Sequence, residues 1–149
     1  MVEGALVILP LIAIGFALFD YSLAIFIQNT LRNAVREGVR YAITQQTGAG
    51  GQDAAITNVV EMNSMGFLNS SNVGTDSSPA TITVQYYSPS TLTQVTGTGS
   101  NGAGNICVVT ATIQHGWMAP VWRSSGVMTF TASSSDVMES PPGGVLPTR

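Results

Sequence analysis

The sequence predicts an α+β protein in which one long N-terminal helix packs on a small antiparallel sheet of about three to four strands. Two observations predict this fold. Residues 1–46 carry a continuous helical pattern, and three later segments alternate apolar and polar side chains with the period of a strand. The residues left after the helix suffice for one small domain. We therefore expect a helix (1–46), a globular domain (47–139) and a flexible tail (140–149).

The predicted N-terminal helix changes character along its length. Its apolar half (4–31) has Asp20 as its only charged side chain, whereas its second half (32–46) is amphipathic. A helix over residues 2–45 would be roughly 65 Å long, and the hydrocarbon core of a bilayer is only about 30 Å thick. The apolar half can therefore cross a membrane while the amphipathic half stands outside it.

Two further features bear on this membrane segment. Pro10 lies inside the apolar half, where it predicts a kink or a loosened turn near residues 6–10. The basic residues nearest to the segment all follow it: Arg32, Arg36 and Arg40. By the positive-inside rule they would place the globular domain in the cytoplasm. A basic leader that precedes Met1 and is later removed would reverse this orientation, and we expect such a leader.

The amphipathic half combines an apolar stripe with an opposite polar face. The apolar stripe consists of Ile27, Leu31, Ala34, Val35, Gly38 and Ala42. The polar face consists of Asn29, Arg32, Asn33, Arg36, Glu37 and Arg40. Glu37 and Arg40 are spaced so that they can pair, which would contribute about 0.2–0.5 kcal/mol. The arginines on this face fit a solvated surface, with a binding site as the alternative.

The globular domain begins after a glycine-rich joint at residues 47–51, which ends the long helix. Asp53 is the expected N-cap of a second helix over residues 54–65. The partly apolar face of that helix carries Ile56, Val59, Val60 and Asn63. Strands are expected at residues 81–86, 106–115 and 127–133, and their apolar faces would pack on the stripe of the long helix.

A long polar loop separates the first two expected strands. Residues 89–105 are rich in Ser, Thr, Gly and Asn and contain no charged residue, and loops of this length are usually functional or mobile. We expect this loop and the tail (140–149) on the outer surface, where they could carry sugars. Asn69 begins an Asn-Ser-Ser sequence, which matches the acceptor pattern for an N-linked glycan but arises often by chance.

The composition argues against an enzyme and against nucleic-acid binding. The chain has no lysine and a net charge of −3, so it lacks the clustered basic residues that nucleic acid requires. His115 has no nucleophile or further metal ligand near it in the sequence, and the acidic residues are scattered. We therefore expect no catalytic, metal or cofactor site. Cys107 is the only cysteine and lies in an apolar strand, which predicts a buried, inert thiol.

Two carboxylates occupy unusual places in the N-terminal helix. Glu3 precedes the apolar run and Asp20 lies within it. A carboxylate in hydrocarbon is costly unless it is partnered. On an ideal helix Asp20 projects within about 20° of Leu31, on the packing side. Asp20 either lies at the level of the lipid headgroups or meets an amine or amide of a neighbouring subunit, and Glu3 either lies at the membrane surface or takes part in assembly.

Three segments resemble the TadE-like pilus protein family. Met1–Pro10 resembles the start of these proteins, where a glutamate precedes an apolar run that ends in proline. Asn33–Ala42 resembles their motif Ala-x-Arg-Glu-Gly-x-Arg-Tyr-Ala, and Val127–Glu139 resembles their terminal strand. Residues 88–105 have no counterpart. The resemblance implies a pilin-like structural protein that is not an enzyme and needs no cofactor.

Family members are subunits or minor pseudopilins of tight-adherence (Flp-type) pili. The resemblance implies that a prepilin peptidase removes a basic leader and that the protein is held in the inner membrane with the assembly machinery. Copies of it would then assemble into an extracellular type IV-like filament, with the sheet domain outward. Glu3 would neutralise the N-terminal amine of a neighbouring subunit, although this glutamate is usually fifth in the chain and is third here. The residues expected at the subunit interface are Glu3, Pro10, Asp20, Leu31, Arg36, Glu37 and Arg40.

Three functions therefore remain open. The leading hypothesis is a structural subunit that forms the body of the filament. The second is a minor pseudopilin that primes or tips such a pilus. The third is a membrane-anchored binding module that does not polymerise and that uses residues 89–105 as its binding surface.

Overall fold

The α+β fold is confirmed. The computed structural model describes residues 2–68, 80–117 and 126–149, except for the side chains of residues 2, 3, 5, 6 and 142. The four strands form one antiparallel sheet in the order β2-β1-β3-β4. In chain order the elements are α1 (Val2–Ile43), α2 (Gln52–Asn63), β1 (Thr81–Tyr87), β2 (Gln94–Val95), β3 (Ile106–Gly116), β4 (Val127–Val137) and the 3-10 turn η3 (Pro142–Gly144).

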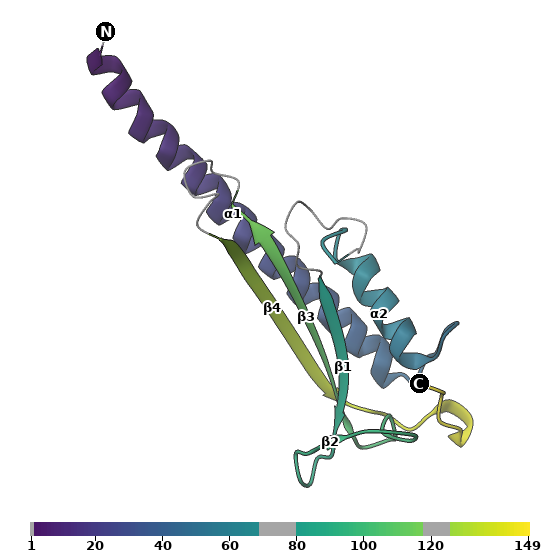
Figure 1. Ribbon diagram of the computed structural model, residues 1–149. Coiled ribbons are helices and arrows are strands. Elements are labelled where there is room, and N and C mark those ends of the chain that lie inside the picture. The colour runs from purple at the N-terminus through teal and green to yellow at the C-terminus, as the bar shows by residue number, and fades with distance from the viewer. Residues whose placement is uncertain (1, 69–79, 118–125) are drawn as a thin grey trace.

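Helix α1 is the longest element, and its N-terminal half projects beyond the rest of the molecule (Figure 1). The helix continues without interruption through Pro10, so the predicted kink does not break it. Proline lacks an N–H, and the one backbone bond that is lost is the bond to the carbonyl of Leu6. The helix ends at Ile43, where Gln45 adopts a positive φ of 56° and glycines follow.

Helix α2 begins and ends two residues earlier than the sequence predicts. The prediction that Asp53 is its N-cap is wrong, because Gly51 holds that position and no side chain caps the helix. Gly51 has a φ of 95°, and a Cβ at this residue would collide with the backbone of Arg149. Only glycine meets both conditions. Asn63, expected on the apolar face, is exposed, and the buried positions are Gln52, Ala55, Ile56 and Val60.

The strands alternate between an inner face and an outer face, as their sequence predicts. On the inner face Val84 of β1 lies opposite Val109 of β3, and Ala111 of β3 lies opposite Ala132 of β4. β4 is four residues longer than predicted at its end. The short strand β2 pairs with the end of β1 and lies within the segment that was expected to be an irregular loop. After β1 the chain turns back in a hairpin, which brings this polar segment to the edge of the sheet as β2.

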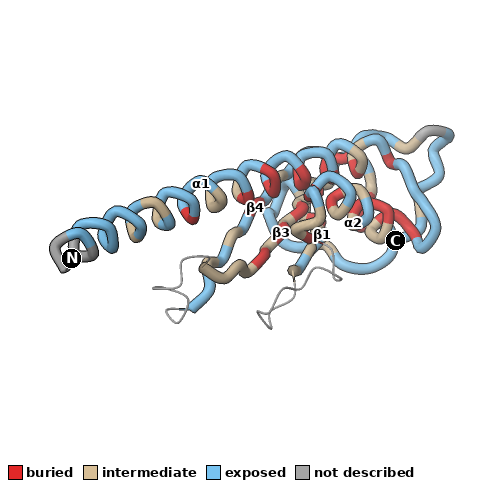
Figure 2. Tube along the Cα trace, turned by 90° about the horizontal axis from the view of Figure 1, so that it is seen from above, coloured by how far each residue is buried: buried red, intermediate tan, exposed pale blue. Residues whose placement is uncertain are grey.

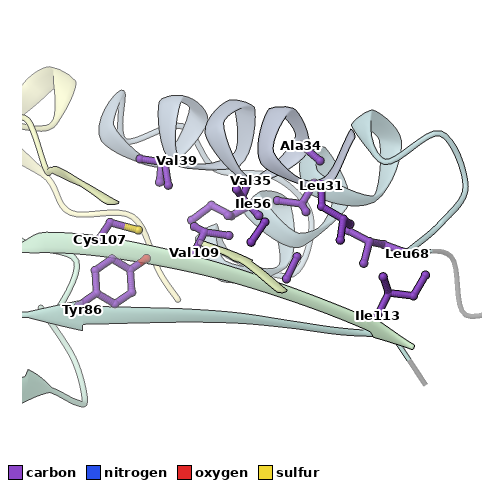
Figure 3. Packing of buried hydrophobic residues seen from close by; sticks show 14 of the residues in the cluster. Leu31, Ala34, Val35, Val39, Ile56, Leu68, Tyr86, Cys107, Val109 and Ile113 are labelled. Carbon is purple, nitrogen blue, oxygen red and sulfur yellow. The ribbon is translucent and has the colours of Figure 1, made fainter. Parts of the chain in front are cut away.

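Both helices cover the inner face of the sheet, and the core lies between this helical layer and the sheet (Figure 2). Leu31 and Val35 of α1 meet Ile56 of α2 and Val109 of β3 in this layer (Figure 3). The two helices approach closely at Gly38, where a Cβ would collide with the side chain of Val60. A glycine at this position permits the close helix–helix contact.

The last residues of the tail (140–149), which the sequence predicts to be flexible, form hydrogen bonds to the domain. The backbone N–H of Gln52 donates to the carbonyl of Thr148 at 2.7 Å, and the side-chain amide of Asn101 donates to the carbonyl of Pro147 at 2.9 Å. Both donors belong to residues that are buried and need hydrogen-bond partners. The tail supplies these partners and ends beside the start of α2 (Figure 1).

Candidate functional site

The N-terminal half of α1 exposes large apolar side chains in all directions. Leu9 is 74% exposed and Phe19 is 72% exposed, and the stretch Val7–Phe26 contains several more such residues. Figure 2 shows this half of the helix as almost entirely exposed. By length and composition alone, α1 could cross a membrane. An exposed apolar surface of this extent marks contact with a membrane or with another protein.

The exposed stretch ends where α1 meets the domain. Ile27 and Leu31 are both fully buried, so packing begins before the boundary at residue 31 that the sequence predicts. Leu31 lies in the core of its own chain and has no exposed side chain to offer a neighbouring subunit. Asp20 is only 2% exposed and takes part in an interaction within the chain. Its predicted burial therefore does not require a second copy.

The polar face of α1 faces solvent. Arg36, Glu37 and Arg40 are all exposed. Within the described residues Arg149 forms an ion pair with Asp53, whereas Glu37 and Arg40 do not form the ion pair that their spacing would allow. These three side chains are thus available for contacts outside the chain. Glu3 lies in the first turn of α1 with its side chain outside the described part of the structure, and Asn69 lies outside the described residues.

A polar corner lies at the other end of the domain, formed by Asp53 of α2, Tyr86 of β1 and the loop residues Ser100 and Asn101. Arg149 binds in it. Its Nη2 and Nε donate to Asp53 Oδ2 at 2.7 Å and 3.0 Å. Its guanidinium carbon lies 4.7 Å from the centroid of the Tyr86 ring, and its Nη1 donates to Ser100 Oγ. Tyr86 Oη donates to Asp53 Oδ1 at 2.8 Å.

The electrostatics of the polar corner favour a fixed contact over proton transfer. Burial, and next the hydrogen bond to Asp53, raise the pKa of Tyr86 far above its ordinary value. The hydrogen bond to Asp53 raises the pKa of Arg149. Arg149 thus stays charged and Tyr86 stays neutral throughout the physiological range. A single exposed ion pair contributes only about 0–1 kcal/mol, but this arginine also stacks on a ring and binds a hydroxyl.

Three buried amides connect the polar corner to α1. Gln52 Nε2 donates to the carbonyl of Ala42 at 3.1 Å, and Asn101 Nδ2 donates to Gln52 Oε1 at 2.6 Å. Gln45 Nε2 donates to the carbonyls of Asn101 and Glu139 at 2.9 Å and 3.0 Å. Sequence reasoning missed this network because polar residues in glycine-rich segments read as solvated loop.

Cys107 and His115 contribute no reactive group to the polar corner. Cys107 is fully buried, and burial followed by the charge of Asp53 raises the pKa of its thiol from 9.0 to about 12. The predicted burial of this thiol is confirmed. His115 is partly buried opposite Met128. Across residues 2–68, 80–117 and 126–149, no three His, Cys, Asp or Glu side chains come together as metal ligands would.

Comparison with known proteins bears on the N-terminal helix. Residues 1–40 match the TadE-like protein family. The match ends within α1 and confirms the resemblance that the sequence motifs predict. Searches among curated proteins and among solved structures gave no match. The matched residues include the exposed apolar half of α1, which by length and composition could cross a membrane.

Proposed function

We propose that this protein is a pilin-like subunit that α1 anchors in the inner membrane before the same helix packs into the core of an extracellular pilus. The exposed apolar stretch Val7–Phe26 carries this proposal. It lies in the segment that matches the TadE-like family, and the folded domain covers only the buried Asp20 and the end of the stretch, where Leu23 packs on the core and the ring of Phe26 contacts that of Phe67. The second half of α1 packs with α2 and the sheet into one domain, which would face outward.

The energetics of α1 fit a transfer between two apolar surroundings. In water the exposed stretch would cost roughly 25 cal/mol per Å² of apolar surface, so the helix is stable only in lipid or among other helices. Between lipid and a helix bundle the hydrophobic effect nearly cancels, and close packing and polar contacts decide. Ala13 and Ala17 are four residues apart and small, which permits close approach of a neighbouring helix.

The polar residues of α1 would set the register between subunits. Glu3 in the first turn would pair with the N-terminal amine of a neighbour after a prepilin peptidase has removed the leader. Arg36, Glu37 and Arg40 are exposed on the polar face and would contact adjacent subunits, and Pro10 would leave one carbonyl for an interhelical contact. Leu31 and Asp20 would act indirectly, by fixing α1 against its own domain.

The variant Glu3→Ala tests this proposal. We expect it to accumulate in the inner membrane and to be lost from sheared filaments, as detected by immunoblot and mass spectrometry. Glu139→Ala, which changes an exposed carboxylate of the sheet domain, is the matched control and should assemble normally. Normal assembly of Glu3→Ala would contradict the proposal. Surface display of the single protein without any filament would support the membrane-anchored binding module instead.

A minor subunit that primes or tips the pilus is the second candidate, because the family that matches the helix is the TadE-like one. The same exposed helix would insert such a subunit into a filament made mainly of another protein. Its share of a sheared preparation separates the two roles. A filament-forming subunit should dominate the sample, whereas a priming subunit should be present at trace levels and its deletion should abolish the filament.

A further inference from the structure

The segment Pro147–Arg149, here named the strap, binds in a site that is built by distant parts of the chain. The carbonyl of Thr148 accepts a hydrogen bond from the backbone N–H of Gln52, and the carbonyl of Pro147 accepts one from the side-chain amide of Asn101. These contacts recognise a peptide backbone of any sequence. The guanidinium contacts of Arg149 with Asp53, Tyr86 and Ser100 add selectivity for arginine.

The polar corner is preorganised by contacts that do not involve the strap. Tyr86 donates to Asp53, which orients the carboxylate. Asn101 donates to Gln52 Oε1, and Gln52 in turn donates to the carbonyl of Ala42. The absence of a side chain at Gly51 leaves room for the backbone of Arg149. These contacts would hold the site in shape when the strap leaves it.

The strap is joined to the domain by a linker that is largely exposed. Met138 and Glu139 are the last residues before it that donate backbone hydrogen bonds to the domain, to Asn105 and Ile43. Val145, within the linker, is 78% exposed, and Gly143 and Gly144 adopt positive φ. The strap is therefore held by its own contacts and not by the linker.

We propose that the polar corner is a peptide-binding site selective for an arginine side chain, and that the strap is its tethered, reversibly bound ligand. The two charge-assisted hydrogen bonds from the guanidinium to Asp53 Oδ2 select arginine over uncharged side chains. The site does not depend on the proposed role of α1 in a filament.

A peptide titration on the full chain in detergent tests this proposal. Arg149→Gln weakens the strap and leaves the corner intact, so a synthetic peptide with the sequence of residues 145–149 should bind it saturably. The same peptide ending in glutamine should bind at least about tenfold more weakly. Adding Asp53→Asn to the protein should cause a similar loss, whereas adding Glu139→Gln should not. Equal binding of the two peptides, or no effect of Asp53→Asn, would overturn the proposal.

Amide hydrogen exchange supplies a second test without added peptide. The N–H of Gln52 is bonded to the strap, whereas the N–H of Ala55 is bonded to Gly51 within the first turn of α2. In Arg149→Gln the Gln52 amide should exchange at least about tenfold faster and the Ala55 amide should be unchanged. Equal acceleration of both amides, or failure of this variant to fold, would show that the strap is an integral part of the core and would overturn the proposal.

Discussion

The two halves of α1 belong to one continuous helix and both carry apolar side chains, yet only the second half buries them within the protein itself. Leu9 and Phe19 in the first half are largely exposed, whereas Leu31 and Val35 in the second half are buried in the core. The first half is apolar on every face, and the second half restricts its apolar residues to one stripe. The apolar content of a helix predicts that the helix is removed from water. The distribution of its apolar side chains around the helix axis predicts whether its own domain covers it or whether a membrane or another protein does.

The largest expected effect separates the two halves by stability. Leu31→Ala removes a fully buried side chain from the core and should lower the free energy of unfolding of the domain by about 2–5 kcal/mol. Leu18→Ala, in the exposed half, should change it by no more than about 0.5 kcal/mol. Thermal and denaturant unfolding in detergent would measure both. Equal losses would mean that the exposed half also packs on the domain.

The converse effect separates the halves by membrane insertion. Ile14→Arg places a charge in the exposed stretch and should disfavour insertion by about 2.5–3.5 kcal/mol. The unfolding of the domain should not change. Fractionation of membranes would measure the loss, with Asn29→Arg on the polar face as the control that should insert normally. Unimpaired insertion of Ile14→Arg would argue that the first half is not the membrane segment.

The two halves of α1 can also be compared by adding a single methyl group to a glycine in each half. Gly38→Ala forces a methyl group into the side chain of Val60 and should lower the free energy of unfolding by about 1–3 kcal/mol. Gly15→Ala meets open space and should be neutral, or should stabilise the helix by up to about 1 kcal/mol. Paired denaturant titrations would measure the difference. If both variants had the same stability, the close approach of α1 and α2 would be refuted.

The packed region should also lose stability in alkali. The folded state keeps the Cys107 thiol protonated because its pKa is raised from 9.0 to about 12, whereas the unfolded state releases the proton above pH 9. Stability is therefore complete below about pH 9 and falls by about 1.4 kcal/mol per pH unit as the pH rises towards 12. The raised pKa of Tyr86 acts in the same direction. Unfolding followed against pH should show a shallower slope for Cys107→Ala, and an unchanged slope would contradict this assignment.

The smallest effect on stability is expected on the solvated face of the packed half. Arg36→Ala and Arg40→Ala should each change the free energy of unfolding by no more than about 0.5 kcal/mol, because both side chains are exposed. If these arginines contact adjacent subunits, the variants should still reduce the yield of sheared filaments. Arg32→Ala on the same face is the control. A normal filament yield for both variants would mean that Arg36 and Arg40 only face solvent and do not contact adjacent subunits.

Local patterns in the sequence were sufficient for the fold class, the long helix and the three long strands. Apolar residues recurring with the helical period at Leu31 and Val35, and with the strand period at Val109 and Ala111, define which face is buried. The match to the TadE-like family covers most of the long helix. Buried apolar faces could be predicted because their periodicity is a property of consecutive residues.

The polar corner and the strap were decided by the tertiary structure alone. Asp53 reads in sequence as a helix cap, yet its carboxylate is occupied by Tyr86 and Arg149, which are 33 and 96 residues away. The glycine-rich loop and the tail read as solvated because nothing in their local pattern marks Asn101 or Thr148 as partners. Hydrogen bonds between distant polar groups leave no period in the sequence, and they form only where the packed core has already brought those groups within bonding distance.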